Sequence, residues 1–108
     1  MFPKKAYIDI LEHLRNSGFN FKFLLDNVSP GDICIRHDID FSVDSAYAIA
    51  KEEIKLDIKT SYFFTLNSYF YNIFTPNSVK IIDNILSMGH KVSLHIDPTL
   101  YLDKSELL

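Results

Sequence analysis

Most of the chain alternates short stretches rich in β-branched or aromatic residues with amphipathic helical stretches. The strand-like stretches cover residues 33–40, 58–66 and 91–96, and the helical stretches between them cover 43–56 and 76–88. Helices of this length can return the chain across a sheet, and such crossovers join parallel strands with right-handed connections. The sequence therefore predicts the α/β class, with a parallel βαβαβ unit.

A shorter region precedes this unit. Apolar residues at helical spacing predict a helix over 3–16, and the alternating pattern of 19–23 predicts a short strand or extended segment. Ser42 is expected to cap the first helix of the βαβαβ unit, because its hydroxyl can accept a hydrogen bond from a free backbone N–H. Gly89 is expected to end the second.

The length of 108 residues predicts a single domain over 1–108. We expect a helix and extended segment at 1–31, the βαβαβ core at 32–97, and the start of a further element at 98–108. Three parallel strands leave two bare sheet edges, whereas parallel sheets are normally covered on all sides. The chain is therefore expected to be truncated, as the first part of a larger domain.

Composition narrows the classes of function. The formal net charge is −3, and the 11 Lys and Arg residues are scattered, which argues against nucleic-acid binding because phosphate binding needs clustered cations. No apolar run approaches the roughly 18 residues of a membrane helix. The N-terminus lacks the pattern of a secretory signal, and the single cysteine, Cys34, has no internal disulfide partner. These features predict a soluble, cytoplasmic protein without a membrane span.

Unusual polar residues follow two of the expected strands. Asp38 and Asp40 are two positions apart, so both side chains leave the same face of a strand. His95 lies near the end of another strand, and functional sites of α/β sheets form at the carboxyl ends of their strands. Carboxylate and imidazole ligands together suit a divalent metal such as zinc. The alternative for the two aspartates is a helix cap and a surface charge.

Four other residues are expected to be structural. His37 points away from Asp38 and is expected to hydrogen-bond a neighbouring loop. His90 follows a helix end and is expected to satisfy its last carbonyl groups. Cys34 is expected to be a small core residue, and His13 is expected to face solvent.

Residues 36–40 (RHDID) are similar to the R-H-D-[IV]-D signature of a branch of the polysaccharide deacetylases, the NodB-like carbohydrate esterase family 4. Further stretches are similar in the same order. Residues 46–53 resemble A-x-x-x-A-x-x-E, 60–64 resemble T-[YS]-[YF]-F-F, 71–72 match Y-N, and 89–97 resemble G-H-E-I-G-L-H-[YF]-D. The order of several short motifs is more specific than any one of them.

The resemblance implies a distorted (β/α) barrel that holds a divalent metal, usually zinc, and hydrolyses N- or O-acetyl groups on carbohydrates. In this family's pattern Asp38 corresponds to the general base that activates a metal-bound water, and Asp40 corresponds to a metal ligand. His95 corresponds to the first histidine ligand. A barrel of this kind is about twice as long, so the resemblance implies only its first half, with the remaining residues of the site beyond Leu108.

Two departures affect these roles. The better-known members have adjacent acids, whereas Ile39 separates them here, so the base and ligand roles of Asp38 and Asp40 are interchangeable. Those members also place a second histidine ligand four residues after the first, where this chain has Thr99. Asp97 is the substitute candidate for that metal ligand, or else a residue of a turn.

Two other functions remain open. The chain could be a catalytically inactive fragment or interaction remnant, with the missing C-terminal half or a second copy pairing with its sheet edges. The Asp38-x-Asp40 pair also resembles the opening motif of haloacid-dehalogenase-like phosphatases, where the first acid attacks phosphate and Mg²⁺ binds nearby. The Arg-His pair at 36–37 interrupts the apolar strand that this motif needs, and the phosphatase motif does not explain His95.

Overall fold

The structure is a computed structural model that describes residues 4–23, 26–27, 29–40, 42–66, 68 and 70–95. It contains three helices and five strands within these ranges. In chain order they are α1 (Lys4–Asn16), β1 (Asn20–Lys22), β2 (Asp32–Cys34), β3 (Arg36–Ile39), α2 (Val43–Lys55), β4 (Ser61–Thr65), α3 (Pro76–Ser87) and β5 (Lys91–His95).

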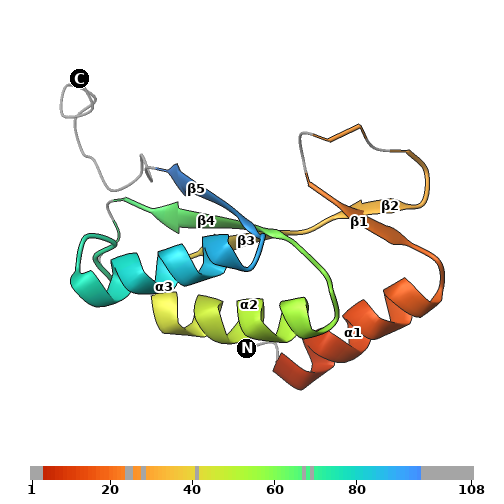
Figure 1. Ribbon diagram of the computed structural model, residues 1–108, viewed down its shortest axis with the longest axis horizontal. Coiled ribbons are helices and arrows are strands. Elements are labelled where there is room, and N and C mark those ends of the chain that lie inside the picture. The colour runs from red at the N-terminus through yellow and green to blue at the C-terminus, as the bar shows by residue number, and fades with distance from the viewer. Residues whose placement is uncertain are drawn as a thin grey trace.

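The strands β3, β4 and β5 form one parallel sheet in that order. The helices α2 and α3 are the connections, and both lie on the same side of the sheet (Figure 1). The predicted parallel βαβαβ unit is therefore confirmed. Closure into a (β/α) barrel stays a prediction, and residues 98–108, expected to begin a further element, lie outside the described residues.

The sequence pattern of residues 33–40 predicts one buried strand that ends in polar side chains, and this prediction is wrong in two respects. The segment is divided at Ile35 into β2, which pairs with β1 in a separate parallel sheet, and β3. The exposed and half-buried residues of β3 alternate, because β3 is an edge strand of the described sheet and α2 and α3 cover only one face of that sheet. Cys34 of β2 is half-buried, and its thiol lies 3.6 Å from the carbonyl oxygen of Phe23.

The core lies between the sheet and the two helices. Tyr62 and Phe64 of β4 are fully buried there, and they pack with Ala50 of α2 and Ile85 of α3. The side chains of β4 are mostly buried because a strand flanks it on either side. Burial of large apolar side chains against the helices supplies most of the stabilisation of such a unit.

The helix ends are fixed by residues that the sequence identifies. The Ser42 hydroxyl accepts a hydrogen bond from the Ser45 N–H, which confirms the predicted cap of α2. Thr75 caps α3 in the same manner through the Ser78 N–H. Gly89 follows α3 with a φ of +98°, a left-handed conformation that favours glycine.

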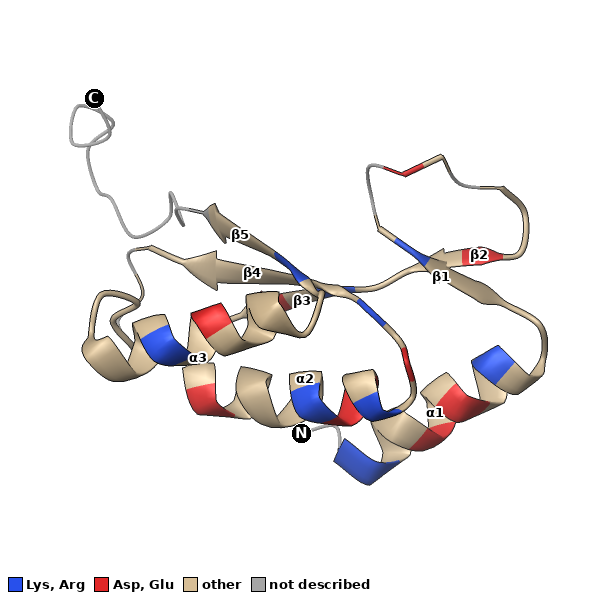
Figure 2. Ribbon diagram, in the orientation of Figure 1, with Lys and Arg blue, Asp and Glu red and all other residues tan. Residues whose placement is uncertain are grey.

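Charged residues of both signs are interspersed along α1 and α2 (Figure 2). His13 is exposed on α1, as expected. None of the helices in the described ranges combines the length and apolar character that crossing a membrane requires.

Candidate functional site

The face of the sheet opposite α2 and α3 carries Asp38. Its Cα is in register with those of Phe63 on β4 and Ser93 on β5. The Arg36 Nε–H donates a hydrogen bond to Asp38 Oδ1 at 2.6 Å, and the Arg36 guanidinium lies 3.8 Å from the centre of the Phe63 ring. The Asp38 side chain is 50% exposed. Asp38 is therefore a solvent-accessible carboxylate whose orientation is held by a neighbouring cation.

Two other candidate positions, Asp40 and His95, lie at the carboxyl ends of β3 and β5. Asp40 directly follows β3 and is exposed. His95 is the last residue of β5, and its Cα is in register with that of Thr65. Since β4 lies between them, β3 and β5 are roughly 10 Å apart. Asp97 lies outside the described residues, as does the side chain of His95.

The residue types at these positions are ones that can bind a divalent metal. Zinc accepts a carboxylate oxygen such as that of Asp40, or of Asp38 if the two roles are exchanged, and an imidazole such as that of His95. The carboxyl ends of parallel strands meet at one edge, so the backbone brings these positions to the same part of the molecule. Within the described ranges, no three His, Cys, Asp or Glu side chains already form a metal-binding group.

The loop between β4 and α3 also reaches this edge. The Tyr71 hydroxyl accepts a hydrogen bond from the Thr65 N–H at 2.7 Å and donates one to the Ile39 carbonyl. The Ser68 hydroxyl lies 3.4 Å from the Asp40 carbonyl oxygen. The loop therefore contacts the backbone immediately before and at Asp40.

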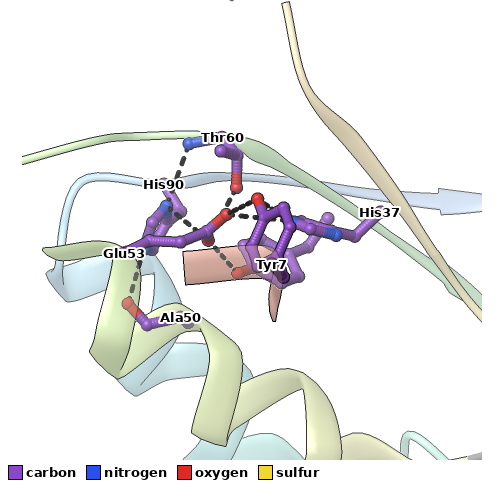
Figure 3. A network of polar contacts seen from close by, with 7 residues as sticks. Tyr7, His37, Ala50, Glu53, Thr60 and His90 are labelled. Carbon is purple, nitrogen blue, oxygen red and sulfur yellow. Dashed lines mark hydrogen bonds and ion pairs between the residues drawn. The ribbon is translucent and has the colours of Figure 1, made fainter. Parts of the chain in front are cut away.

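A buried carboxylate lies on the side of β3 that is opposite to Asp38. Glu53 of α2 is fully buried and accepts hydrogen bonds from four side chains that belong to α1, to β3, to β4 and to the segment before β4 (Figure 3). The donors are Tyr7 (2.5 Å), His37 Nε2 (2.8 Å), Thr60 Oγ1 (2.9 Å) and the Tyr62 hydroxyl. An ionised carboxylate accepts only, so Nε2 of His37 carries the proton in this contact.

The structure corrects the expected roles of two histidines. His37 does point away from Asp38, but its partner is Glu53 rather than a loop. His90 does not bind the end of α3: its Nδ1 accepts from the Thr60 N–H at 3.0 Å, and its Nε2 lies 3.1 Å from the Ala50 carbonyl of α2. Since Nδ1 accepts, the proton is on Nε2, and the 4.0 Å approach of Nδ1 to Glu53 Oε1 is not an ion pair.

The pKa values of this network reflect burial and charge. Burial alone raises the pKa of the Glu53 carboxyl, but hydrogen bonds and charge from His37, with hydrogen bonds from Tyr62 and Tyr7, outweigh it and hold that pKa below its usual range. Burial, followed by the neighbouring Glu53 carboxylate, raises the pKa of Tyr7 and of Tyr62 far above the usual value for a phenol.

Alkaline titration is expected to separate these two tyrosines from the rest. A folded-state pKa above the unfolded value contributes stability that is fully present below about pH 10 and is lost as the pH rises toward the folded-state pKa. Of the six tyrosines, Tyr7 and Tyr62 are therefore expected to ionise only as the chain unfolds. Ultraviolet phenolate absorbance and circular dichroism, followed together, measure this. Ionisation of all six tyrosines before any loss of circular dichroism contradicts it.

A cavity of about 470 Å³ lies beside β3 on the side of Glu53. Its lining combines apolar and polar residues, namely Ile35, Ala48, Ile49, Lys4, Tyr7, Arg36, His37 and Ser45. Asp38 does not line the cavity, but its ion-pair partner Arg36 does.

Sequence reasoning did not assign a role to Glu53 or Tyr71. A signal for Glu53 exists, because Ala46, Ala50 and Glu53 follow one another at helical spacing, which places a carboxylate on the buried face of α2. A buried carboxylate requires several hydrogen-bond donors. Tyr71 is part of the stretch that matches Y-N, but nothing in the sequence indicates its hydrogen-bond partners, because it lies in a loop whose path depends on tertiary contacts.

Scans against protein-family models, curated proteins and solved structures found no match to this chain. The resemblance to the polysaccharide deacetylases therefore depends on the short motifs of residues 36–97.

Proposed function

We propose that this chain belongs to a metal-dependent hydrolase that removes acetyl groups from N- or O-acetylated carbohydrates. In this proposal Asp38 is the general base, and Asp40, His95 and Asp97 are candidate ligands of a divalent metal, zinc in the first instance. The single observation that supports it most is the parallel arrangement of β3, β4 and β5, because their carboxyl ends bring Asp40 and His95 to one edge of the sheet. The ordered motifs supply the reaction class.

The residues present suit the separate tasks of such a reaction. A bound divalent metal lowers the pKa of water and polarises an acyl oxygen. The exposed Asp38 carboxylate can accept a proton, and its ion pair with Arg36 restricts its orientation. Arg36 is itself held by the Phe63 ring. The base is therefore pre-oriented on the face of the sheet that no described helix covers.

Zinc titration of the purified chain tests the proposed ligands. We expect one zinc ion per chain. We expect Asp40→Ala and His95→Ala each to weaken zinc binding by more than tenfold, because even the loss of an outer group that orients a metal ligand costs roughly 10- to 100-fold in affinity. Isothermal calorimetry at fixed pH measures the affinity, and elemental analysis measures the amount bound.

The matched controls are Asp83→Ala on α3 and His13→Ala on α1, both at exposed positions away from the carboxyl edge. They are expected to bind zinc as the wild type does. Equal weakening by the controls indicates non-specific binding. A folded wild-type chain that binds no zinc contradicts the proposed function.

A further inference from the structure

The cavity beside β3 has the size of a small-molecule site. It lies where residues of α1, of α2 and of the start of β3 meet, and its volume is about 470 Å³. Pockets that bind small molecules usually measure roughly 300–1,000 Å³ and combine an apolar wall with a few polar groups that orient the ligand. The described lining has this mixed composition.

The apolar wall includes a second face of α2. Val43, Ala46 and Ala50 of this helix are buried in the core between the helices and the sheet. Ala48 and Ile49 lie on a different side of the helix, where they line the cavity and stay half-buried. A helix of a small α/β unit needs only one apolar face to cover its sheet. The second apolar face is therefore free to contact the body of a ligand.

Two rings line the cavity in a fixed arrangement. The ring centres of Tyr7 and His37 lie 5.6 Å apart, with the ring planes at 80°. Both side chains hydrogen-bond the buried Glu53 carboxylate, which holds their orientation (Figure 3). Rings in edge-to-face geometry leave edges and faces that pack favourably against a further ring. This part of the lining favours an aromatic ligand.

The charged residues of the described lining are Lys4 and Arg36, and neither Asp nor Glu is among its members. The Lys4 ammonium lies 3.7 Å from Glu52 Oε1, too far for a hydrogen bond, so that carboxylate does not use its N–H donors. Arg36 donates to Asp38 through Nε–H, one of several N–H donors of a guanidinium. The lining therefore carries an excess of positive charge, which complements an anionic group on a ligand.

From these observations we propose that the cavity binds a small aromatic carboxylate. The aromatic body of this ligand contacts Ala48, Ile49 and the rings of Tyr7 and His37, and its carboxylate faces Lys4. The site goes beyond the proposed hydrolase function and does not require zinc. A ligand held in this cavity joins α1 to α2 and β3, so its binding stabilises the folded chain.

Calorimetric titration with 2-naphthoate tests the proposal. A chelator is present throughout, so the carboxylate cannot bind through a metal ion. We expect one molecule per chain with a Kd below about 1 mM, and a higher midpoint of thermal unfolding when the ligand is present. The matched cation, 2-naphthylmethylammonium, has a similar body and is expected to bind at least about tenfold more weakly, because its charge has the sign of the lining.

Two pairs of variants locate the site. Ala48→Phe places a large side chain in the space of the ligand and is expected to abolish binding, whereas Ser87→Phe, at an exposed position on α3, is expected to leave it unchanged. Lys4→Gln is expected to weaken 2-naphthoate binding by about two- to fivefold, the range of a partly exposed ion pair. Its control is Lys5→Gln, because Lys5 is 86% exposed and pairs with Asp9 on the same helix.

Nuclear magnetic resonance of the wild-type chain keeps the test independent of how well Ala48→Phe folds. Amide shifts on addition of 2-naphthoate that are largest at Ile35, Ala48 and Ile49 support the proposal. Shifts confined to other parts of the chain overturn the cavity as the site. Equal affinity for the carboxylate and the ammonium compound overturns the choice of ligand, and a folded chain that does not bind 2-naphthoate at about 1 mM overturns the proposal. The proposed function, which is tested with zinc, stands or falls separately.

Discussion

Replacement of Glu53 by alanine is expected to lower the free energy of unfolding by about 3–5 kcal/mol, the range found when one member of a buried ionic pair is removed. The substitution leaves the buried hydroxyl of Thr60 and the ring nitrogen of His37 without their acceptor. It also removes a hydrogen bond that joins α1 to α2 through Tyr7. Urea unfolding, followed by circular dichroism, measures the change.

The adjacent residue provides a matched control. Glu52 is on the same helix but forms ion pairs with Lys4 and Lys55 near the surface, at 3.7 and 3.4 Å. Exposed pairs of this kind contribute about 0–1 kcal/mol, so Glu52→Ala is expected to change the stability by no more than that. Equal effects of the two substitutions would show that the buried network of Glu53 does not stabilise the fold.

The pH dependence follows from the direction of the Glu53 shift. A folded-state pKa below the unfolded value contributes stability that is present above the unfolded pKa of about 4.3 and is lost as the pH falls through the folded-state pKa. The stability difference between the wild type and Glu53→Gln is therefore expected to shrink on acidification through this range. The pH dependence is opposite for Tyr7 and Tyr62, whose contribution to the stability of the fold is lost at high pH.

The sequence predicted the elements of the core well, because their signals are local. Helical periodicity and the Ser42 cap locate α2, and Pro76 and Gly89 bracket α3. Alternation of strands with helices of crossover length predicts parallel pairing, which the registers of β3, β4 and β5 confirm. These features depend on backbone preferences and on one buried face per helix, both of which are encoded by neighbouring residues.

The break between β2 and β3 could not be predicted in this way. The β-branched run around Ile35 has the composition of one continuous strand. Its division depends on β1, which pairs with β2 in a separate sheet. This pairing ends at Cys34, before β3 begins. Strand pairing across different parts of the chain is a tertiary effect, and local propensity does not determine it.

For the candidate site, the sequence predicted where its residues lie on the strands but not which residues they contact. The spacing of Asp38 and Asp40 and their place after a strand indicate the carboxyl edge of the sheet. The residues that contact this edge of the sheet are harder to predict from the sequence. Arg36 contacts Asp38 because alternate residues share a strand face, whereas Tyr71 reaches Ile39 from a loop 32 positions away.

Asp38→Asn is expected to slow zinc-dependent release of acetate from an N- or O-acetylated sugar by roughly 10²- to 10⁴-fold, the usual contribution of a general base. The amide has nearly the same shape as the carboxylate but does not accept a proton in the reaction. Zinc binding is expected to remain, since Asp40 and His95 are the proposed ligands. The rate of acetate release, with the affinity for zinc measured alongside, separates loss of the base from loss of the metal.

Asp83→Asn serves as the control for this substitution, because Asp83 is exposed on α3 and lies outside the carboxyl edge of the sheet. Its rate is expected to equal that of the wild type. If Asp38→Asn instead loses zinc and Asp40→Asn keeps it while losing activity, the base and ligand roles of the two aspartates are exchanged. A rate unchanged by Asp38→Asn contradicts its role as a base.

The most direct measurement is the release of acetate by the wild-type chain from a panel of N- and O-acetylated sugars, with added zinc and with a chelator. The proposed function predicts release with zinc that stops when the chelator removes the metal and returns when zinc is restored. The contradicting result is a folded, zinc-loaded chain that releases no acetate from any sugar in the panel.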